Sequence, residues 1–206
     1  MKKTIALLMV MMMLVIPAGC GSKDKLSEKE VAGILSEDLD AEKEDAEDII
    51  EALKERDLRF FEDGVWSSFD RKQTKRFYQR FELRRYLGSV SDCKSSICYA
   101  RGEGLKTRRT VIVMVLTFEN EKDAEAFVDD TSDTWDDEKA LYPENDSSDE
   151  KDEFMAWGCD YDCDVYIGAY KSGNKVVAVI DVNAEDFLEE VCDAFGLTDP
   201  ATLREG

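Results

Sequence analysis

The sequence predicts an α+β fold, in which N-terminal helices precede an antiparallel or mixed sheet that further helices cover. Three observations lead to this prediction. A capping box introduces helix-periodic segments near the N-terminus, two β-branched runs follow later in the chain, and each run precedes an asparagine and another helix-periodic segment. From residue 109 onward the predicted order is strand, helix, strand, strand, helix.

The N-terminal part of the domain is predicted to contain two helices. Ser27 and Glu30 have the spacing of a capping box, in which each side chain binds the backbone amide of the other residue. Apolar residues follow at helical spacing. A second helix is predicted from about residue 41 to 56, with one apolar and one acidic face. An acidic face of this kind is typical of a solvated surface.

The segment from residue 70 to 88 has two interpretations. Its apolar residues alternate with polar or aromatic ones, which favours a half-buried strand. Asp70 with Gln73, and Gly88 at the far end, are equally able to cap a helix. We predict a strand from the alternation.

The segments after residue 108 have clearer patterns. Residues 109–118 are rich in Val, Ile and Thr and predict a strand. Asn120 is expected to cap the next helix, because its side-chain oxygen can accept a hydrogen bond from a free backbone amide. The inward face of this helix carries five residues at helical spacing: Ala124, Phe127, Val128, Thr131 and Trp135. Residues 142–153 are polar and acidic and predict a solvated loop.

The C-terminal part predicts a hairpin and a last helix. Strands at 164–170 and 175–182 are joined around a Gly-Asn pair, which is a hairpin turn signal. We expect Asn183 to cap the last helix and Gly196 to end it.

The first twenty residues have the form of an export signal. Two lysines follow Met1, and an uncharged apolar run extends from Ile5 to Ile16. A membrane-spanning helix takes about 18–20 apolar residues, so this run is too short to span and instead predicts a signal peptide. Two small residues and a cysteine follow directly. An ordinary cleaved secretory signal with a chance cysteine is the alternative.

Ala18-Gly19-Cys20, preceded by Ile16-Pro17, resembles the lipobox of bacterial lipoproteins, with a proline in place of the usual aliphatic residue. The resemblance implies that Cys20 is diacylated and that the signal is cut just before it. The membrane would then be a partner through the acyl chains, because two chains anchor a protein stably. We therefore expect a protein that is anchored in the cell membrane and faces the extracytoplasmic side.

This resemblance implies three segments. Residues 1–19 are the signal peptide, residues 20–26 are the lipidated cysteine and a polar tether, and residues 27–206 are a single α+β domain. In layout the chain is also similar to small surface lipoproteins of uncharacterised function in Gram-positive bacteria. That similarity is generic and assigns no site.

Composition excludes several classes of function. The chain has 206 residues, with 27 Lys+Arg, 47 Asp+Glu, no histidine and a formal net charge of −20. Such acidity argues against nucleic acid as a partner, because a phosphate backbone needs a basic surface. Without histidine the chain lacks the commonest general base and the commonest metal ligand. No cofactor motif is present, so no cofactor is expected.

The cysteines after Cys20 predict disulfides. Two close pairs, Cys93/Cys98 and Cys159/Cys163, lie in a chain with an export signal, and outside the cytosol such pairs usually form disulfides. Two local bridges are predicted, with cross-pairing between the pairs or a four-cysteine zinc site as alternatives. Cys192 lies on the apolar face of the last helix and is expected to be a buried thiol.

Basic residues are concentrated between positions 71 and 109, where twelve of them accompany three acidic residues. We expect this basic strip to neutralise the acidic helices and loops of the same molecule. The alternative is an anion-binding face for phospholipid head groups or an anionic wall polymer. Its candidate ligands are four arginines: Arg76, Arg80, Arg84 and Arg85.

Two function hypotheses follow. The first is a non-enzymatic, lipid-anchored surface protein that binds an unidentified extracytoplasmic ligand or protein. The alternative is a small exported hydrolase with paired carboxylates. We favour the binding module, because no catalytic motif is present in the sequence.

Overall fold

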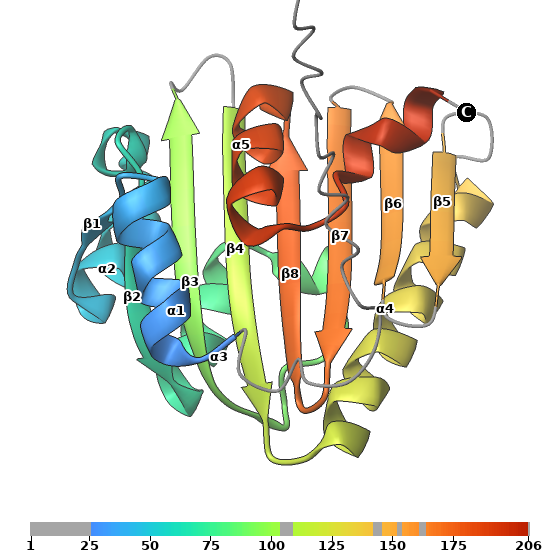
Figure 1. Cartoon of the computed structure of the whole chain (residues 1–206), viewed down its shortest axis with the longest axis horizontal. Helices are drawn as coiled ribbons and strands as arrows, with labels where there is room; N and C mark the ends of the chain where they lie inside the picture. Colours follow the sequence, from blue (N-terminus) through green and yellow to red (C-terminus); the bar gives the residue numbers. More distant parts are fainter. Residues whose placement is uncertain (1–25, 104–108, 142–145, 152–153, 161–163, 206) are drawn as a thin grey trace, which may run out of the picture.

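The computed structural model describes residues 26–103, 109–141, 146–151, 154–160 and 164–205. Its strands form one eight-stranded sheet of order β1-β2-β3-β4-β8-β7-β6-β5 (Figure 1). Neighbouring strands are antiparallel except β1 and β2, which are parallel, so the sheet is mixed. The strands are β1 Glu42–Lys43, β2 Val65–Asp70, β3 Cys93–Glu103, β4 Arg109–Phe118, β5 Asp146–Lys151, β6 Phe154–Asp160, β7 Asp164–Ser172 and β8 Lys175–Val182.

Helices cover both faces of this sheet (Figure 1). One face, here the α1/α5 face, carries α1 Glu28–Gly33 with its π-helical continuation Ile34–Asp38, and α5 Glu185–Phe195. The opposite, α2–α4 face carries α2 Ala46–Glu55, α3 Arg71–Arg80 and α4 Glu121–Leu141. Short 3-10 segments lie at Leu58–Phe61, Leu83–Arg85 and Pro200–Glu205. The predicted α+β class is confirmed.

Two hydrophobic cores lie on either side of the central strands. Side chains alternate along a strand, so a strand covered on both faces must be apolar at successive positions. In β4, three valines face the α1/α5 core and three larger residues face the other core: Val111, Val113 and Val115, then Ile112, Met114 and Leu116. This double coverage explains the unbroken apolar run in the sequence.

Several predicted caps and faces are confirmed. Ser27 and Glu30 form the capping box of α1. Asn120 Oδ1 accepts the amide of Asp123 at 3.0 Å at the start of α4. Four of the five inward residues predicted for this helix are buried and the fifth is partly buried. Gly196 ends α5 in the left-handed conformation, with φ 64°.

The strand predicted within residues 70–88 is wrong. The structure has helix α3 here, and Asp70 and Gln73 form its capping box. Thr74, Phe77 and Tyr78 are buried, at the i, i+3, i+4 spacing of one helix face. The alternation is ambiguous because the larger apolar residues also stand four positions apart. This spacing fits both the two-residue period of a strand and the 3.6-residue period of a helix.

Two smaller predictions are also wrong. Residues 146–151 belong to strand β5, within the segment predicted as a loop, because β6 offers them a hydrogen-bonding partner. Asn183 does not cap α5. Its side chain accepts the amide of Asp164 at 3.0 Å, while the carboxylate of Asp181 accepts the amide of Ala184 at 3.2 Å.

Candidate functional site

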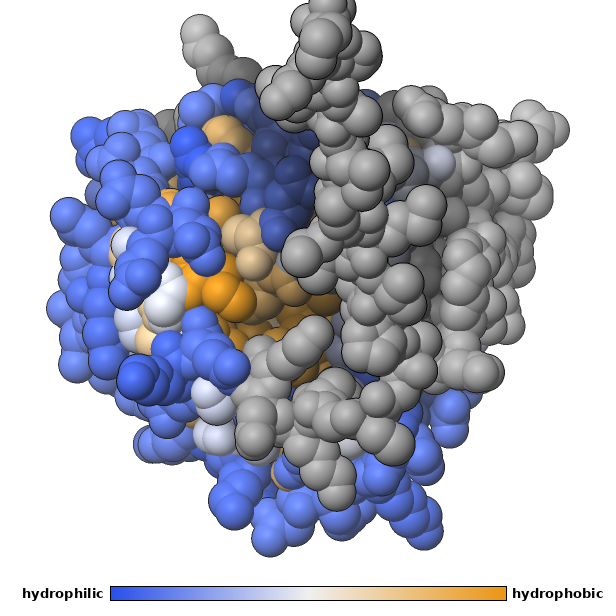
Figure 2. Space-filling model, viewed as in Figure 1, coloured by the Kyte–Doolittle hydropathy of each residue, from blue (hydrophilic) through white to orange (hydrophobic). Residues whose placement is uncertain are grey.

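A pocket of about 250 Å³ opens on the α1/α5 face, beside the first described residue. Its apolar side chains are those of Leu26, Ile97 and Val115, and its polar side chains are those of Glu28, Ser68, Ser95, Thr117 and Lys175. Phe69 and Ser96 also line it, but their side chains pack on the opposite face of the sheet. We call it the Lys175 pocket. Figure 2 shows hydrophobic surface in the middle of this face, with hydrophilic side chains beside it on the side of α1.

The register of four adjacent strands builds this pocket. One row of cross-strand partners runs from Ser68 through Ile97 to Val115 and supplies the apolar floor. Directly opposite residues in a sheet share a face, so these three side chains lie together. The next row on the same face runs from Ser95 through Thr117 to Lys175 and supplies hydroxyls and one cation. The pocket is therefore apolar in the middle and polar at one end.

Two side chains of opposite charge line the pocket, and each is held by a neutral partner. The Glu28 carboxylate accepts a hydrogen bond from the Ser68 hydroxyl at 3.0 Å. The Lys175 ammonium donates to the backbone carbonyl of Leu26. Both residues are described, and no ion pair joins them. The pocket can therefore offer one cation and one anion to a ligand.

The pocket residues are far apart in the sequence, and sequence analysis did not identify them as a site. Lys175 begins β8, which lies beside β4 although α4 and three strands separate the two in the sequence. Glu28 belongs to the first turn of α1. Only the strand order and register, which the sequence pattern does not specify, place them at one pocket.

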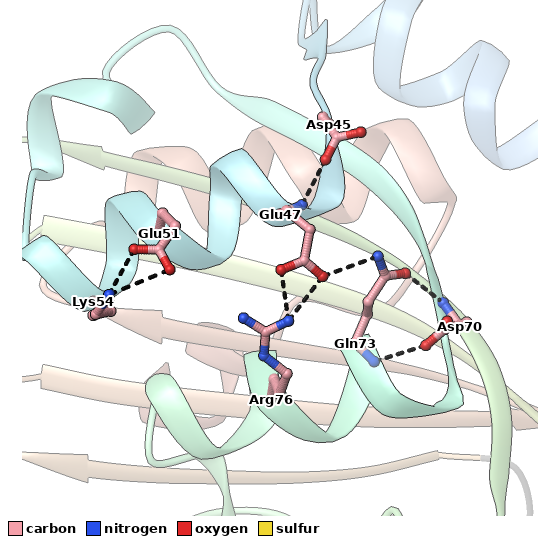
Figure 3. Close-up of polar contacts among 7 residues, drawn as sticks. All are labelled: Asp45, Glu47, Glu51, Lys54, Asp70, Gln73 and Arg76. Carbon is pink, nitrogen blue, oxygen red and sulfur yellow. Dashed lines mark hydrogen bonds and ion pairs between the residues drawn. The ribbon is translucent and has the colours of Figure 1, made fainter.

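The predicted anion-binding arginines do not form a shared site. Arg76 on α3 donates from Nη1 to both carboxylate oxygens of Glu47 on α2, at 2.8 and 2.6 Å (Figure 3). The Gln73 amide also binds Glu47, at 3.3 Å. These hydrogen bonds hold the pKa of the Glu47 carboxyl below its usual value. Arg76 thus joins two helices of the same face.

The other three arginines differ from one another. Arg84 Nη2 binds Asp130 of α4 at 2.9 Å, and its Nη1 binds the Leu87 carbonyl at 2.9 Å. Arg85 lies 3.8 Å from Glu82. Arg80 is exposed and has no ion pair with any described residue. Three of the four arginines are thus paired with carboxylates of their own chain, as internal neutralisation requires.

Two further arginines of the basic strip also pair with carboxylates of the same chain. Arg101 and Arg109 both stack on the ring of Phe187 in α5, with guanidinium carbons 4.1 and 4.6 Å from its centre. Arg101 pairs with Glu190 at 2.9 Å, and Arg109 pairs with Asp186. The two arginines therefore fasten α5 to β3 and β4.

The predicted Cys93–Cys98 disulfide is absent from the structure, in which both residues are free, buried thiols. Both belong to β3, and five residues of extended chain put their Cα atoms roughly 15 Å apart, whereas a disulfide needs less than about 7 Å. Burial raises the pKa of Cys93 to about 11 and that of Cys192 to about 12, so these thiols are protonated at neutral pH.

The second predicted pair cannot be placed. The Cys159 side chain and all of Cys163 lie outside the described part of the structure. Cys93 and Cys98 make no bridge to them, since both are free. Within the described residues no three Cys, Asp or Glu side chains are placed to hold a metal ion.

A second cavity of about 390 Å³ gathers carboxylates at the other end of the α1/α5 face. Asp40, Glu42, Asp63 and Glu190 line it together with Arg101. All four carboxylates are exposed, whereas a glycosidase-type general acid needs a carboxyl partly withdrawn from water. This cavity gives the hydrolase hypothesis no specific support.

One carboxyl is strongly perturbed, but it lines neither cavity. Asp181 of β8 is fully buried beneath the start of α5. Burial raises its pKa to about 7, against the opposing effect of the hydrogen bond from Ala184. Its Oδ1 has no hydrogen-bond partner among the described residues. Asp181 therefore affects the pH dependence of folding stability and belongs to neither cavity.

Comparison with known proteins adds no assignment. No family model, curated protein or solved structure matches the chain. Residues 1–19 and Cys20 lie outside the described residues, and among the described helices none is long and apolar enough to cross a membrane.

Proposed function

We propose that this protein is a lipid-anchored, extracytoplasmic binding module that holds a small ligand in the Lys175 pocket, close to the membrane surface. The lipobox-like motif at Cys20 supports the anchor. The polar and apolar rows of the pocket support binding, because small-molecule sites combine an apolar lining with a few oriented polar groups.

One observation carries the proposal: the pocket adjoins the point where the tether joins the domain. Leu26 lines the pocket and stands six residues after Cys20. Six extended residues span at most about 20 Å. An anchor at Cys20 would therefore keep the pocket within that distance of the outer leaflet.

The lining favours binding over catalysis. The pocket offers Ser68, Ser95 and Thr117 as hydroxyl groups, but a hydroxyl nucleophile needs an adjacent general base with a suitable pKa. Ser68 donates to Glu28, and both side chains are solvent-accessible at the pocket mouth. Enzymes activate a hydroxyl nucleophile in a site that excludes water, whereas this pair lies at the open mouth of the pocket.

Membrane fractionation tests the anchor. We expect the wild-type protein to stay with membranes after a high-salt wash and Cys20→Ser to lose acylation and membrane retention. Salt-resistant retention of Cys20→Ser would contradict the lipid anchor.

Ligand-observed NMR tests the binding site. The full chain, embedded in nanodiscs of zwitterionic phospholipid, is screened against a panel of small amino acids, sugars and carboxylic acids. We expect at least one compound to bind wild type but not Ser95→Trp, in which the indole fills the pocket. Compounds that bind both proteins equally, or no binding at all, would contradict the assignment of this pocket.

A further inference from the structure

The Lys175 pocket presents two opposite charges that are not used on each other. An ammonium group has three donors, and the Lys175 ammonium uses one on the Leu26 carbonyl. A carboxylate has about four acceptor positions, and the Glu28 carboxylate uses one on the Ser68 hydroxyl. Both groups therefore keep hydrogen-bonding capacity for a ligand that carries the complementary charges.

The neutral partners also hold the two charges in place. The Leu26 carbonyl and the Ser68 hydroxyl hold the two charged groups through neutral contacts. The Glu30 carboxylate, which is hydrogen-bonded to Ser27, also acts on the Lys175 charge through space. A site organised before binding loses less conformational entropy when the ligand arrives. A ligand with one anionic and one cationic group can thus replace water at both ends of the pocket.

The floor and the volume restrict the rest of the ligand. Ile97 and Val115 are cross-strand partners and form an apolar surface in the same pocket as the two charged residues. The pocket has a volume of about 250 Å³ and opens to solvent. This space suits a compact molecule whose branched aliphatic group lies on the floor.

We infer that the Lys175 pocket binds a zwitterionic amino acid with an aliphatic side chain, an inference that rests on the proposed binding function. Lys175 receives the α-carboxylate, Glu28 receives the α-ammonium group, and the side chain lies on Ile97 and Val115. Each charged contact is then a charge-assisted hydrogen bond, which is roughly twice as strong as a neutral one.

Isothermal titration calorimetry on the full chain in zwitterionic nanodiscs tests this ligand class. The probes are L-leucine, 4-methylpentanoate, which lacks the ammonium group, and 3-methylbutylamine, which lacks the carboxylate. We expect L-leucine to bind and each analogue to bind at least about tenfold more weakly, because one of the two charge-assisted hydrogen bonds is then lost. Equal binding of either analogue would overturn the zwitterion and assign a site for a single charge.

Matched variants locate the effect. Lys175→Met and Glu28→Gln should each weaken L-leucine binding at least about tenfold, whereas Lys175→Arg, which keeps the charge, should weaken it less. Lys94→Met and Glu55→Gln remove exposed charges elsewhere and should leave binding unchanged. Circular dichroism and thermal melting establish that each variant is folded. Undiminished binding by folded Lys175→Met or Glu28→Gln would overturn the assigned contacts.

The outcome for the ligand class can be separated from that for the proposed function. If L-leucine does not bind but another compound of the screen binds wild type and not Ser95→Trp, the amino-acid inference fails and the binding function stands. If no compound binds in either experiment, both fail.

Discussion

Arg76 on α3 and Glu47 on α2 form an ion pair in which one guanidinium nitrogen lies 2.8 and 2.6 Å from the two carboxylate oxygens (Figure 3). The pair joins the most basic helix to one of the acidic helices and packs both against the same face of the sheet. Basic and acidic segments that are separate in the sequence thus pair with each other in the folded molecule.

This relationship predicts different effects for two arginines on the same helix. Arg76→Glu places a carboxylate beside Glu47 and should lower the melting temperature, because like charges in contact repel. Arg80→Glu, one turn further along α3, alters an exposed arginine that forms no ion pair with a described residue, and it should change the melting temperature little. Thermal melts at low and high salt give the melting temperatures of both variants, and high salt should reduce the difference between them. Equal effects of the two reversals would contradict the role of the pair.

Gly88 predicts a steric effect without any change of charge. A Cβ atom added there would lie 2.2 Å from the backbone carbonyl oxygen of Phe127 in α4. Gly88→Ala must therefore push α4 away and should cost about 1–3 kcal/mol of unfolding free energy. Gly33→Ala is the control, because no atom lies within 4 Å of its added Cβ. Urea denaturation that shows Gly88→Ala as stable as wild type would contradict this close approach.

Asp181 predicts a pH-dependent stability. Its pKa rises from 3.8 to about 7 on folding. The contribution of Asp181 to the free energy of unfolding is therefore fully present below about pH 4 and is lost as pH rises through 7. Asp181→Asn keeps the size and removes the charge. We expect its melting temperature to exceed that of wild type at pH 8, and this advantage to shrink towards pH 5. A variant with no greater advantage at pH 8 than at pH 5 would contradict the burial of an ionisable carboxyl.

The thiols of β3 predict a specific result in peptide mass spectrometry. Native protein alkylated without reduction should yield Cys93 and Cys98 as unlinked cysteines that react only slowly, because both are buried and their pKa values are raised. The same peptides should react rapidly after denaturation. A Cys93–Cys98 crosslink would contradict the extended strand between them. The Cys159–Cys163 bridge stays a prediction that the same experiment tests.

The predictable elements are those whose local pattern agrees with the final structure. Strands β4 and β8 begin and end at the predicted residues, because β-branched runs covered on both faces have one stable arrangement. The apolar spacing of helix α3 predicts a strand because it fits both the strand period and the helix period. Its Asp70–Gln73 capping box was the better signal, since it marks the first turn of a helix directly.

The remaining features depend on contacts that are distant in sequence. Strand β5 is polar and acidic, and it is a strand only because it pairs with β6. The Lys175 pocket combines residues of α1, β2, β3, β4 and β8, whose proximity follows from the sheet order. The pairing of Arg76 with Glu47 likewise requires two helices to lie side by side.

Methyl NMR of the full chain in nanodiscs tests the central claim most directly, because Ile97 and Val115 carry reporter methyl groups on the pocket floor. Addition of L-leucine, or of any compound found by the screen, should shift the signals of these two residues. The methyl groups of Ile49 and Ile50, buried on the opposite face of the sheet, should not move. Binding that shifts Ile49 and Ile50 while Ile97 and Val115 stay unchanged would contradict the Lys175 pocket as the binding site.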